Sequence, residues 1–108
     1  MKLKFFVFCP DDKEVVNRVI AAAASAGAGK IGNYSECAFI TRGRGHWKSE
    51  EGAHPTIGKV GEVSEINEVK IEMECSEVQA IAVVGAIRKV HPYESVVVDF
   101  VELREIEA

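Results

Sequence analysis

Apolar and charged residues alternate along the stretch EVKIEMEC, residues 68–75. Alternation with a period of two places every second side chain on the same side of a strand. The pattern therefore predicts a strand with one face in a core and the other face in contact with water. The apolar set is Val69, Ile71, Met73 and Cys75.

Three further segments have the composition of strands. KLKFFVFC, residues 2–9, is short, aromatic and bounded by a proline, and SVVVDFVEL, residues 95–103, is rich in β-branched residues. YSECAFITRG, residues 34–43, is a plausible second strand in chain order. Residues 43–61 carry five glycines and a proline, so we expect a long loop or a flexible hairpin there, and residues 104–108 form a polar tail.

Two segments repeat apolar residues at helical spacing. The first begins after Pro10, where Asp11 and Glu14 form a capping-box pattern, and ends at Gly27. The second begins at Ser76, which forms the same pattern with Gln79, and ends at the HPYE stretch. The apolar stripes are Val15, Val16, Val19, Ile20 and Ala23 in the first helix, and Ala80, Val83, Val84, Ile87 and Val90 in the second.

The order of elements is β-α-β-β-α-β within one domain that covers residues 1–108. This order consists of two β-α-β halves. It predicts an α+β, ferredoxin-like sandwich, in which two helices cover one face of a four-stranded antiparallel sheet. Val69, Ile71, Met73, Val96, Val98 and Phe100 should then lie beneath the helices. Phe6, Phe8 and Ile40 should lie on the opposite face, where an apolar patch favours oligomerisation through the sheet.

Charge and composition limit the classes of partner and the cellular location that fit this chain. The net charge of −4 argues against a nucleic acid or an anionic membrane as a partner. No apolar run approaches the roughly 20 residues that span a bilayer. The three cysteines are an odd number without a C-x-x-C pair, which favours free thiols and a cytoplasmic location.

Gly27, Gly29 and Gly32 have the spacing G-x-G-x-x-G of a dinucleotide-binding loop. That loop follows a strand and opens a helix, whose amino-terminal N–H groups hold the pyrophosphate. Here the glycines follow a helix and lead into a strand, so the nearby helix dipole is negative and disfavours phosphate. The sequence therefore predicts a helix C-cap and a tight turn at this position.

Three stretches together, AGAGKIGNYSECAF, GRGHWKSEEGAHPTIGKVGEVSEINEVKIE and HPYE, are similar to one family. Between about Lys4 and Leu103 the chain resembles the PII-like insert domain of the Nif-three-like dinuclear-metal proteins (the YqfO group). The resemblance implies a fold like that of CutA and the PII signal proteins, associated in threes. The metals of the larger proteins lie on a separate body that nothing here matches, so the resemblance implies no dinuclear site in this chain. Relatives read closer to GTFRP and GANP where this chain has His46 and His54.

From the resemblance and the residues we expect a non-enzymatic, trimeric binding or regulatory module with clefts between its subunits. Its ligand is a small molecule or a protein. Trp47 is the only tryptophan, and with Arg44 and Lys48 it forms a candidate contact for a protein or a small anion. Alternatively, Trp47 folds over the sheet and seals an apolar patch. The candidate cleft residues are Gly29, Gly32, Asn33, Tyr34, His91, Tyr93 and Glu94.

A divalent-metal protein is the alternative. His91 and Glu94, three residues apart, would bind zinc or copper with the help of His46 or His54. The structural interpretation is that His91 caps the preceding helix and that Glu94 accepts hydrogen bonds from the glycine loop at residues 27–32. A minimal metal-dependent hydrolase is a third class. Separately, Cys37 with a histidine base is a candidate nucleophile, but strand alternation favours packing for this cysteine.

Overall fold

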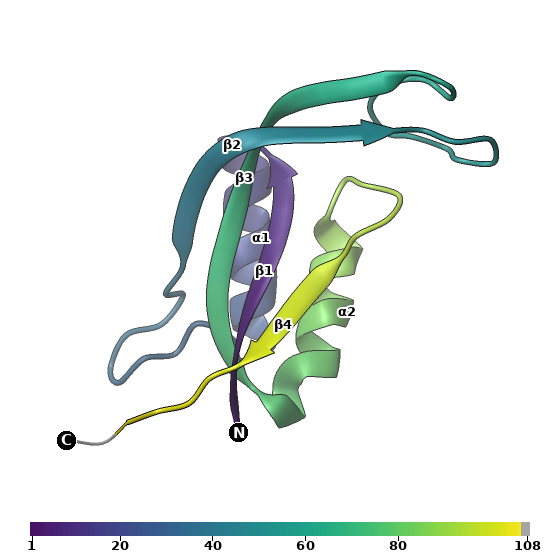
Figure 1. Cartoon of the computed structure of the whole chain (residues 1–108). Helices are drawn as coiled ribbons and strands as arrows, with labels where there is room; N and C mark the ends of the chain where they lie inside the picture. Colours follow the sequence, from purple (N-terminus) through teal and green to yellow (C-terminus); the bar gives the residue numbers. More distant parts are fainter. Residues whose placement is uncertain (107–108) are drawn as a thin grey trace.

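The computed structural model describes residues 1–106 and confirms the α+β sandwich (Figure 1). Its sheet has the order β2-β3-β1-β4, and all neighbouring strands are antiparallel. The last two residues of the predicted polar tail, 107–108, lie outside the described residues. The elements are β1 (Lys2–Pro10), α1 (Lys13–Ser25), β2 (Phe39–Lys48), β3 (Val63–Ser76), the 3₁₀ turn η1 (Glu77–Gln79), α2 (Ala80–Val90) and β4 (Val98–Glu102).

The hydrophobic core lies between the sheet and the two helices. The alternating residues of β3 are buried as predicted, and they face Phe5, Val7 and Cys9 of β1 across the β1–β3 pair. Val96, Val98 and Phe100 pack against this core as partly buried side chains, also as predicted. The helices contribute Val16, Val19, Ala23, Val83 and Ile87.

The helix that follows β1 begins one residue later than predicted. Its N-cap is Asp12, whose carboxylate accepts the N–H groups of Glu14 at 2.9 Å and Val15 at 3.2 Å. Asp11, the predicted cap, instead forms an ion pair with Arg42 at 3.4 Å. Both residues can cap a helix, and here the Asp11 carboxylate is engaged by Arg42.

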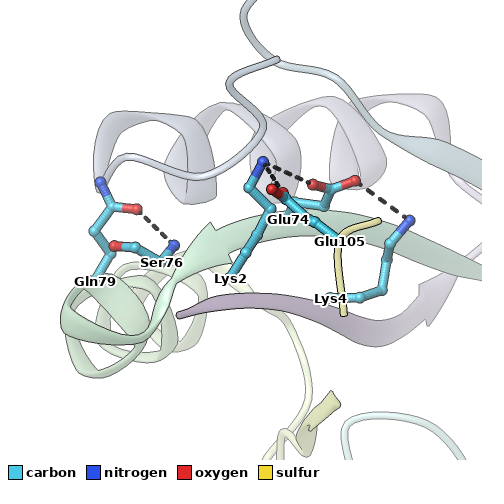
Figure 2. Close-up of polar contacts among 6 residues, drawn as sticks. All are labelled: Lys2, Lys4, Glu74, Ser76, Gln79 and Glu105. Carbon is cyan, nitrogen blue, oxygen red and sulfur yellow. Dashed lines mark hydrogen bonds and ion pairs between the residues drawn. The ribbon is translucent and has the colours of Figure 1, made fainter. Parts of the chain in front are cut away.

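The second capping pattern forms where β3 passes into η1. The Ser76 N–H donates to Oε1 of Gln79 at 3.0 Å (Figure 2). Nearby, the carboxylate of Glu74 lies between the ammonium groups of Lys2, at 3.8 Å, and Lys4, at 3.7 Å. These contacts stand at the end of the sheet where β1 begins and β4 ends.

The first and last strands of the domain lie side by side. They pair in antiparallel fashion from Leu3 opposite Glu102 to Val7 opposite Val98. Just beyond this ladder, the Leu103 N–H donates to the carbonyl of Lys2 at 3.0 Å. The chain therefore enters and leaves the sheet at the same end (Figure 1).

Strands β2 and β3 continue well past the end of β1 and form a projecting hairpin, residues 44–67, which we call the arm. Pairing between β1 and β3 stops at Pro10 opposite Glu68, whereas β2 and β3 stay paired as far as Lys48 opposite Val63. In Figure 1 the arm bends across the end of β1 and over the connection between α2 and β4. The molecule consequently measures 51 Å along its longest axis and 24 Å along the other two.

Of the two alternatives expected for residues 43–61, a long loop or a hairpin, the structure has the hairpin. Residues 43–48 are strand, and the connection between β2 and β3 spans only residues 49–62. The extent of the paired strands was not predicted, because Gly43 and Gly45 lack side chains to show a pattern, although their backbones pair with β3. Strand β2 also begins later than expected, at Phe39. Tyr34, the first residue of the expected strand, instead closes a tight turn with Ile31 through two reciprocal backbone hydrogen bonds of 3.0 and 2.9 Å.

The sheet face away from the helices, which we call the open face, differs from the prediction at one position. Phe6 and Phe8 lie on it, and Phe8 is 44% exposed. The placement of Ile40 was wrong, because Ile40 pairs with Ile71, a residue that faces the helices. Phe39 occupies the open face instead, opposite Glu72. A shift of one residue in a strand exchanges its two faces.

Neither helix within residues 1–106 combines the length and the apolar character needed to cross a membrane.

Candidate ligand cleft between the arm and the HPYE turn

The HPYE stretch, His91–Glu94, forms the turn between α2 and β4. Helix α2 ends at Val90, and His91 has an extended backbone with φ −76° and ψ 137°. This conformation is expected for a residue that precedes a proline, because the proline ring disfavours helical geometry there. The turn therefore carries the chain from the helix layer toward the end of β1.

His91 fastens this turn to the sheet. Its side chain is buried, with Nε2 2.8 Å from the carbonyl oxygen of Phe8 and Nδ1 accepting the Tyr93 N–H at 3.1 Å. Both bonds form together when Nε2 carries the proton and the ring is neutral. Phe8 follows the last residue of β1 that pairs with β4, so the imidazole binds a carbonyl beyond that ladder. Burial lowers the pKa of His91, while its bond to the Phe8 carbonyl and the charge of Glu68 oppose this shift.

Tyr93 extends the connection to β3. Its hydroxyl donates to Oε2 of Glu68 at 2.5 Å. Its ring lies 4.8 Å from the His91 ring and 6.1 Å from the Trp47 ring, measured between centroids. Burial raises the pKa of Tyr93, and the hydrogen bond to Glu68 adds to the rise. Strand β1, the turn and the base of the arm are thus joined by a continuous set of contacts.

The tip of the arm is tied to the same turn. Oε1 of Glu94 accepts the backbone N–H of His54 at 2.9 Å, and the hydroxyl of Thr56 donates to the carbonyl of Pro92 at 2.7 Å. The partner of Glu94 is therefore the tip of the arm, whereas the sequence analysis expected the glycine loop at residues 27–32. These two bonds hold the connection 49–62 against a segment about 40 residues further along the chain.

A cleft of about 460 Å³ opens between the arm and the turn. Its lining is mainly apolar, with Trp47 and Tyr93 as its aromatic members. This volume and character suit a small organic ligand. The lining residues are Trp47, Lys48, Ser49, Glu50, Ala53, Pro55, Thr56, Ile57, Tyr93, Glu94 and Ser95.

The structure divides the predicted cleft residues into two groups. Tyr93 and Glu94 line the cleft, and His91 supports them. Gly29, Gly32, Asn33 and Tyr34 belong to a loop at the other end of the sheet, where the Gly29 N–H donates to the carbonyl of Glu74 at 2.7 Å. One chain does not bring the two groups together, so a shared site requires a second subunit.

The cationic side chains near Trp47 in the sequence do not share its face of the strand. Successive residues of a strand point to opposite faces, so Trp47 lies on the open face while Arg44 and Lys48 lie on the other. The guanidinium of Arg44 is bound by Glu65, with Nε 2.8 Å from Oε1, and this contact lowers the pKa of Glu65. Trp47 packs against Tyr93 of the HPYE turn, and both its role as a contact for a partner and its role as a cover of the sheet stay predictions.

The candidate metal ligands do not converge. Within the described residues, no group of three His, Cys, Asp or Glu side chains is close enough to hold a metal ion. Both ring nitrogens of His91 are already bonded, and His46 pairs with Glu65 on the arm. Cys37 is half-buried just before β2, with Sγ 3.8 Å from the carbonyl oxygen of Ser35.

The sequence analysis missed two contributors to this region. Glu68 anchors Tyr93, although alternation had marked it as a solvated residue of β3. Thr56 holds the tip of the arm, and its neighbours Pro55 and Ile57 line the cleft. No local signal identifies them, because their partners lie 25 to 36 residues away in the sequence.

Gly45→Ala is expected to break the bond between Tyr93 and Glu68. A Cβ at Gly45 would stand 1.8 Å from Oε1 of Glu68, so the carboxylate must move away from the tyrosine hydroxyl. We expect the free energy of unfolding to fall by about 1.5 kcal/mol, the cost of one hydrogen bond to a charged group. Urea denaturation measures this change.

Gly43→Ala is the matched control, because a Cβ at Gly43 meets no atom within 4 Å. Tyr93→Phe removes the same hydrogen bond from the other side, so Gly45→Ala should cost much less in that background. Equal costs in the two backgrounds would show that Gly45 does not act through Tyr93.

Solved structures identify the class of this fold. CutA from Archaeoglobus fulgidus superposes with a TM-score of 0.72 over 99% of this chain and 88% of that one, at 11% identity. A divalent cation tolerance protein from Thermus thermophilus gives 0.71 over 99% and 88%, at 15% identity. At such low identity the likeness concerns the fold alone, which is that of a CutA-like domain.

Sequence relatives make the identification more specific. The chain is 42% identical over 105 residues to the Bacillus subtilis GTP cyclohydrolase 1 type 2 homolog, covering 97% of this chain and 28% of that protein. A Bacillus cereus protein related to NIF3 superposes with a TM-score of 0.81 at 34% identity, over 96% of this chain and 26% of that one. The chain thus corresponds to the insert domain of the Nif-three-like proteins and spans about a quarter of their length. It matches no established family profile.

Proposed function

We propose that this chain is a non-enzymatic binding or regulatory module of the cytoplasm that assembles as a homotrimer through the open face of its sheet. A small ligand or a protein partner binds in the cleft between the arm and the HPYE turn. The names of the longer relatives denote an activity of proteins of which this chain covers only about a quarter. The proposal therefore does not extend that activity to this chain.

The observation that carries the proposal is the distribution of aromatic residues. Five of the eight Phe, Tyr and Trp residues lie on the open face or against it, and only Phe5 and Phe100 pack within the core region. Phe39 is 67% exposed in the single chain. The charged residues of β3 lie between Phe39 on one side and Phe6 and Phe8 on the other. Exposed aromatic side chains are enriched in protein–protein contacts. The five are Phe6, Phe8, Phe39, Trp47 and Tyr93.

The arm supports the same conclusion. The arm extends beyond the rest of the sheet and contacts the HPYE turn. Most of its residues are exposed. A two-stranded ribbon is marginally stable by itself in water and gains stability when another surface covers it. Neighbouring subunits would supply that surface, and they could bring the loop of Gly29 and Gly32 near the cleft of the next chain.

Phe39→Asp is expected to convert the trimer to a monomer. The substitution buries a carboxylate in the proposed contact but disturbs no core residue, because Phe39 is largely exposed within one chain. Native mass spectrometry of protein purified without chelator or added metal measures the subunit number, and sedimentation velocity checks it.

Val78→Asp is the control for this experiment. Val78 is 92% exposed in η1, away from the open face, so the variant should remain trimeric. A wild-type monomer, or a Phe39→Asp variant that is still trimeric, would contradict assembly through the open face.

A further inference from the structure

The aromatic side of the cleft offers ring faces in place of polar groups. Trp47 and Tyr93 are inclined at 51° with their centroids 6.1 Å apart, and both line the cleft. The tyrosine hydroxyl is bound to Glu68, so the part of Tyr93 left for a ligand is its ring. The negative face of an aromatic ring attracts a cation, most strongly when the site excludes water.

The polar groups of the cleft are predominantly acidic. Glu94 uses Oε1 to accept the His54 N–H, and its Oε2 has no hydrogen-bond partner among residues 1–106. Glu50 adds a second carboxylate to the lining. Lys48 is the one cationic member of the lining, and strand alternation places it on the opposite face from Trp47.

One oxygen of the exposed Glu94 carboxylate is held by a hydrogen bond across the cleft. The bond to His54 and the bond between Thr56 and Pro92 fasten the two sides of the cleft at adjacent points. A ligand therefore meets a largely preformed site, which lowers the entropic cost of binding. An ordered carboxylate beside aromatic rings is the arrangement that recognises alkylammonium and guanidinium groups.

We propose that the cleft binds the cationic head group of a small organic ammonium or guanidinium compound. The head group contacts the rings of Trp47 and Tyr93, and the free oxygen of Glu94 balances its charge. This inference rests on the proposed function of the cleft as a binding site and adds the chemical class of its ligand.

Trp47 is the only tryptophan in the chain, so its fluorescence reports directly on the cleft. We would titrate the full chain with tetramethylammonium chloride at an ionic strength held constant with sodium chloride. Parallel titrations use tert-butanol as a neutral compound of similar shape, and inorganic phosphate as an anion. The expected result is a saturable change in emission with tetramethylammonium and none with the other two.

Glu94→Gln removes the charge but keeps an oxygen that can accept the His54 N–H. It should weaken tetramethylammonium binding roughly tenfold, as expected for the loss of a charge contact. Glu51→Gln is the matched control, because Glu51 is an exposed neighbour outside the lining, and it should bind like the wild type. If urea denaturation shows that Glu94→Gln does not fold, Glu50→Gln is measured instead. It should weaken tetramethylammonium binding by a smaller factor.

Saturation with phosphate but not with tetramethylammonium would overturn the cationic class and leave the cleft as a binding site. No response to any of the three probes, or equal binding by Glu94→Gln and Glu51→Gln, would also overturn the inference. The trimer is tested separately by mass spectrometry of the same samples, so a failure of the assembly is distinguished from a failure of the ligand class.

Discussion

Gly29→Ala is expected to lower the free energy of unfolding by about 3 kcal/mol, the sum of backbone strain and overpacking. Gly29 has φ +80°, which residues with a Cβ rarely adopt. The added Cβ would also stand 2.8 Å from Cε of Met73 and 2.9 Å from the backbone nitrogen of Cys37. The backbone of Cys37 cannot move away freely, because its N–H donates to the carbonyl of Gly29 at 2.9 Å. Urea denaturation followed by circular dichroism measures the loss.

Gly32→Ala separates these two causes. Gly32 has φ +57°, but a Cβ there meets no atom within 4 Å. Gly32→Ala should therefore lower the free energy of unfolding by only about 1 kcal/mol, the cost of backbone strain alone. The G-x-G-x-x-G spacing thus has a structural explanation, in which Gly29 permits close packing and Gly32 permits a turn. Similar costs for the two variants would contradict it.

His91→Ala is expected to destabilise the fold by about 3 kcal/mol, because it leaves two backbone groups without their partner. The carbonyl of Phe8 loses its bond to Nε2, and the N–H of Tyr93 loses its bond to Nδ1. The Tyr93 ring also loses its neighbour, which loosens one wall of the cleft. Urea denaturation gives the change in stability, and Trp47 emission reports on the cleft.

His54→Ala is the control, since His54 is exposed and its hydrogen bond to Glu94 uses the backbone N–H. It should change stability by less than about 0.5 kcal/mol. The pair also tests the metal alternative, because a metal site at these residues predicts less bound metal in both variants. A loss of stability in His91→Ala with unchanged metal content supports the structural role, and a loss of metal without a loss of stability contradicts it.

The pH dependence gives a second measure of the same contact. The pKa of His91 is lowered in the folded protein, so the unfolded chain takes up the proton more readily. The stability that His91 provides is therefore complete above the unfolded pKa of about 6.5, and it decreases as the pH falls below that value. This decrease should be present in His54→Ala and absent in His91→Ala.

The sequence was sufficient for the order of elements and for the core. Alternation in β3 and the helical stripes mark the buried residues, because burial on one side imposes a period on the sequence. The limits of β2 could not be predicted in the same way. Gly43 and Gly45 have no side chains to alternate, and the exposed residues around them follow no period, so only pairing with β3 defines the strand.

The candidate site was predicted only in part, because its contacts join distant segments. The HPYE motif identified Tyr93 and Glu94, which line the cleft. Their partners Glu68 and Thr56 carry no sequence signal, since any polar residue on the surface has the same local context. The motif was grouped with Gly29 and Gly32, whereas the length of β1 separates them within one chain.

The adjacency of the first and last strands determines where this domain can be joined to a longer polypeptide. Because Lys2 and Leu103 are hydrogen-bonded neighbours, both connections to any flanking polypeptide leave from a single place on the surface. Such a domain can replace a surface loop of a host protein without separating the two ends of that loop, and the entropic cost is small. The equivalent region makes up 28% of the Bacillus subtilis relative. A pair of strand ends that already meet lets one folding unit be joined to a longer chain at both ends without separating its first and last strands.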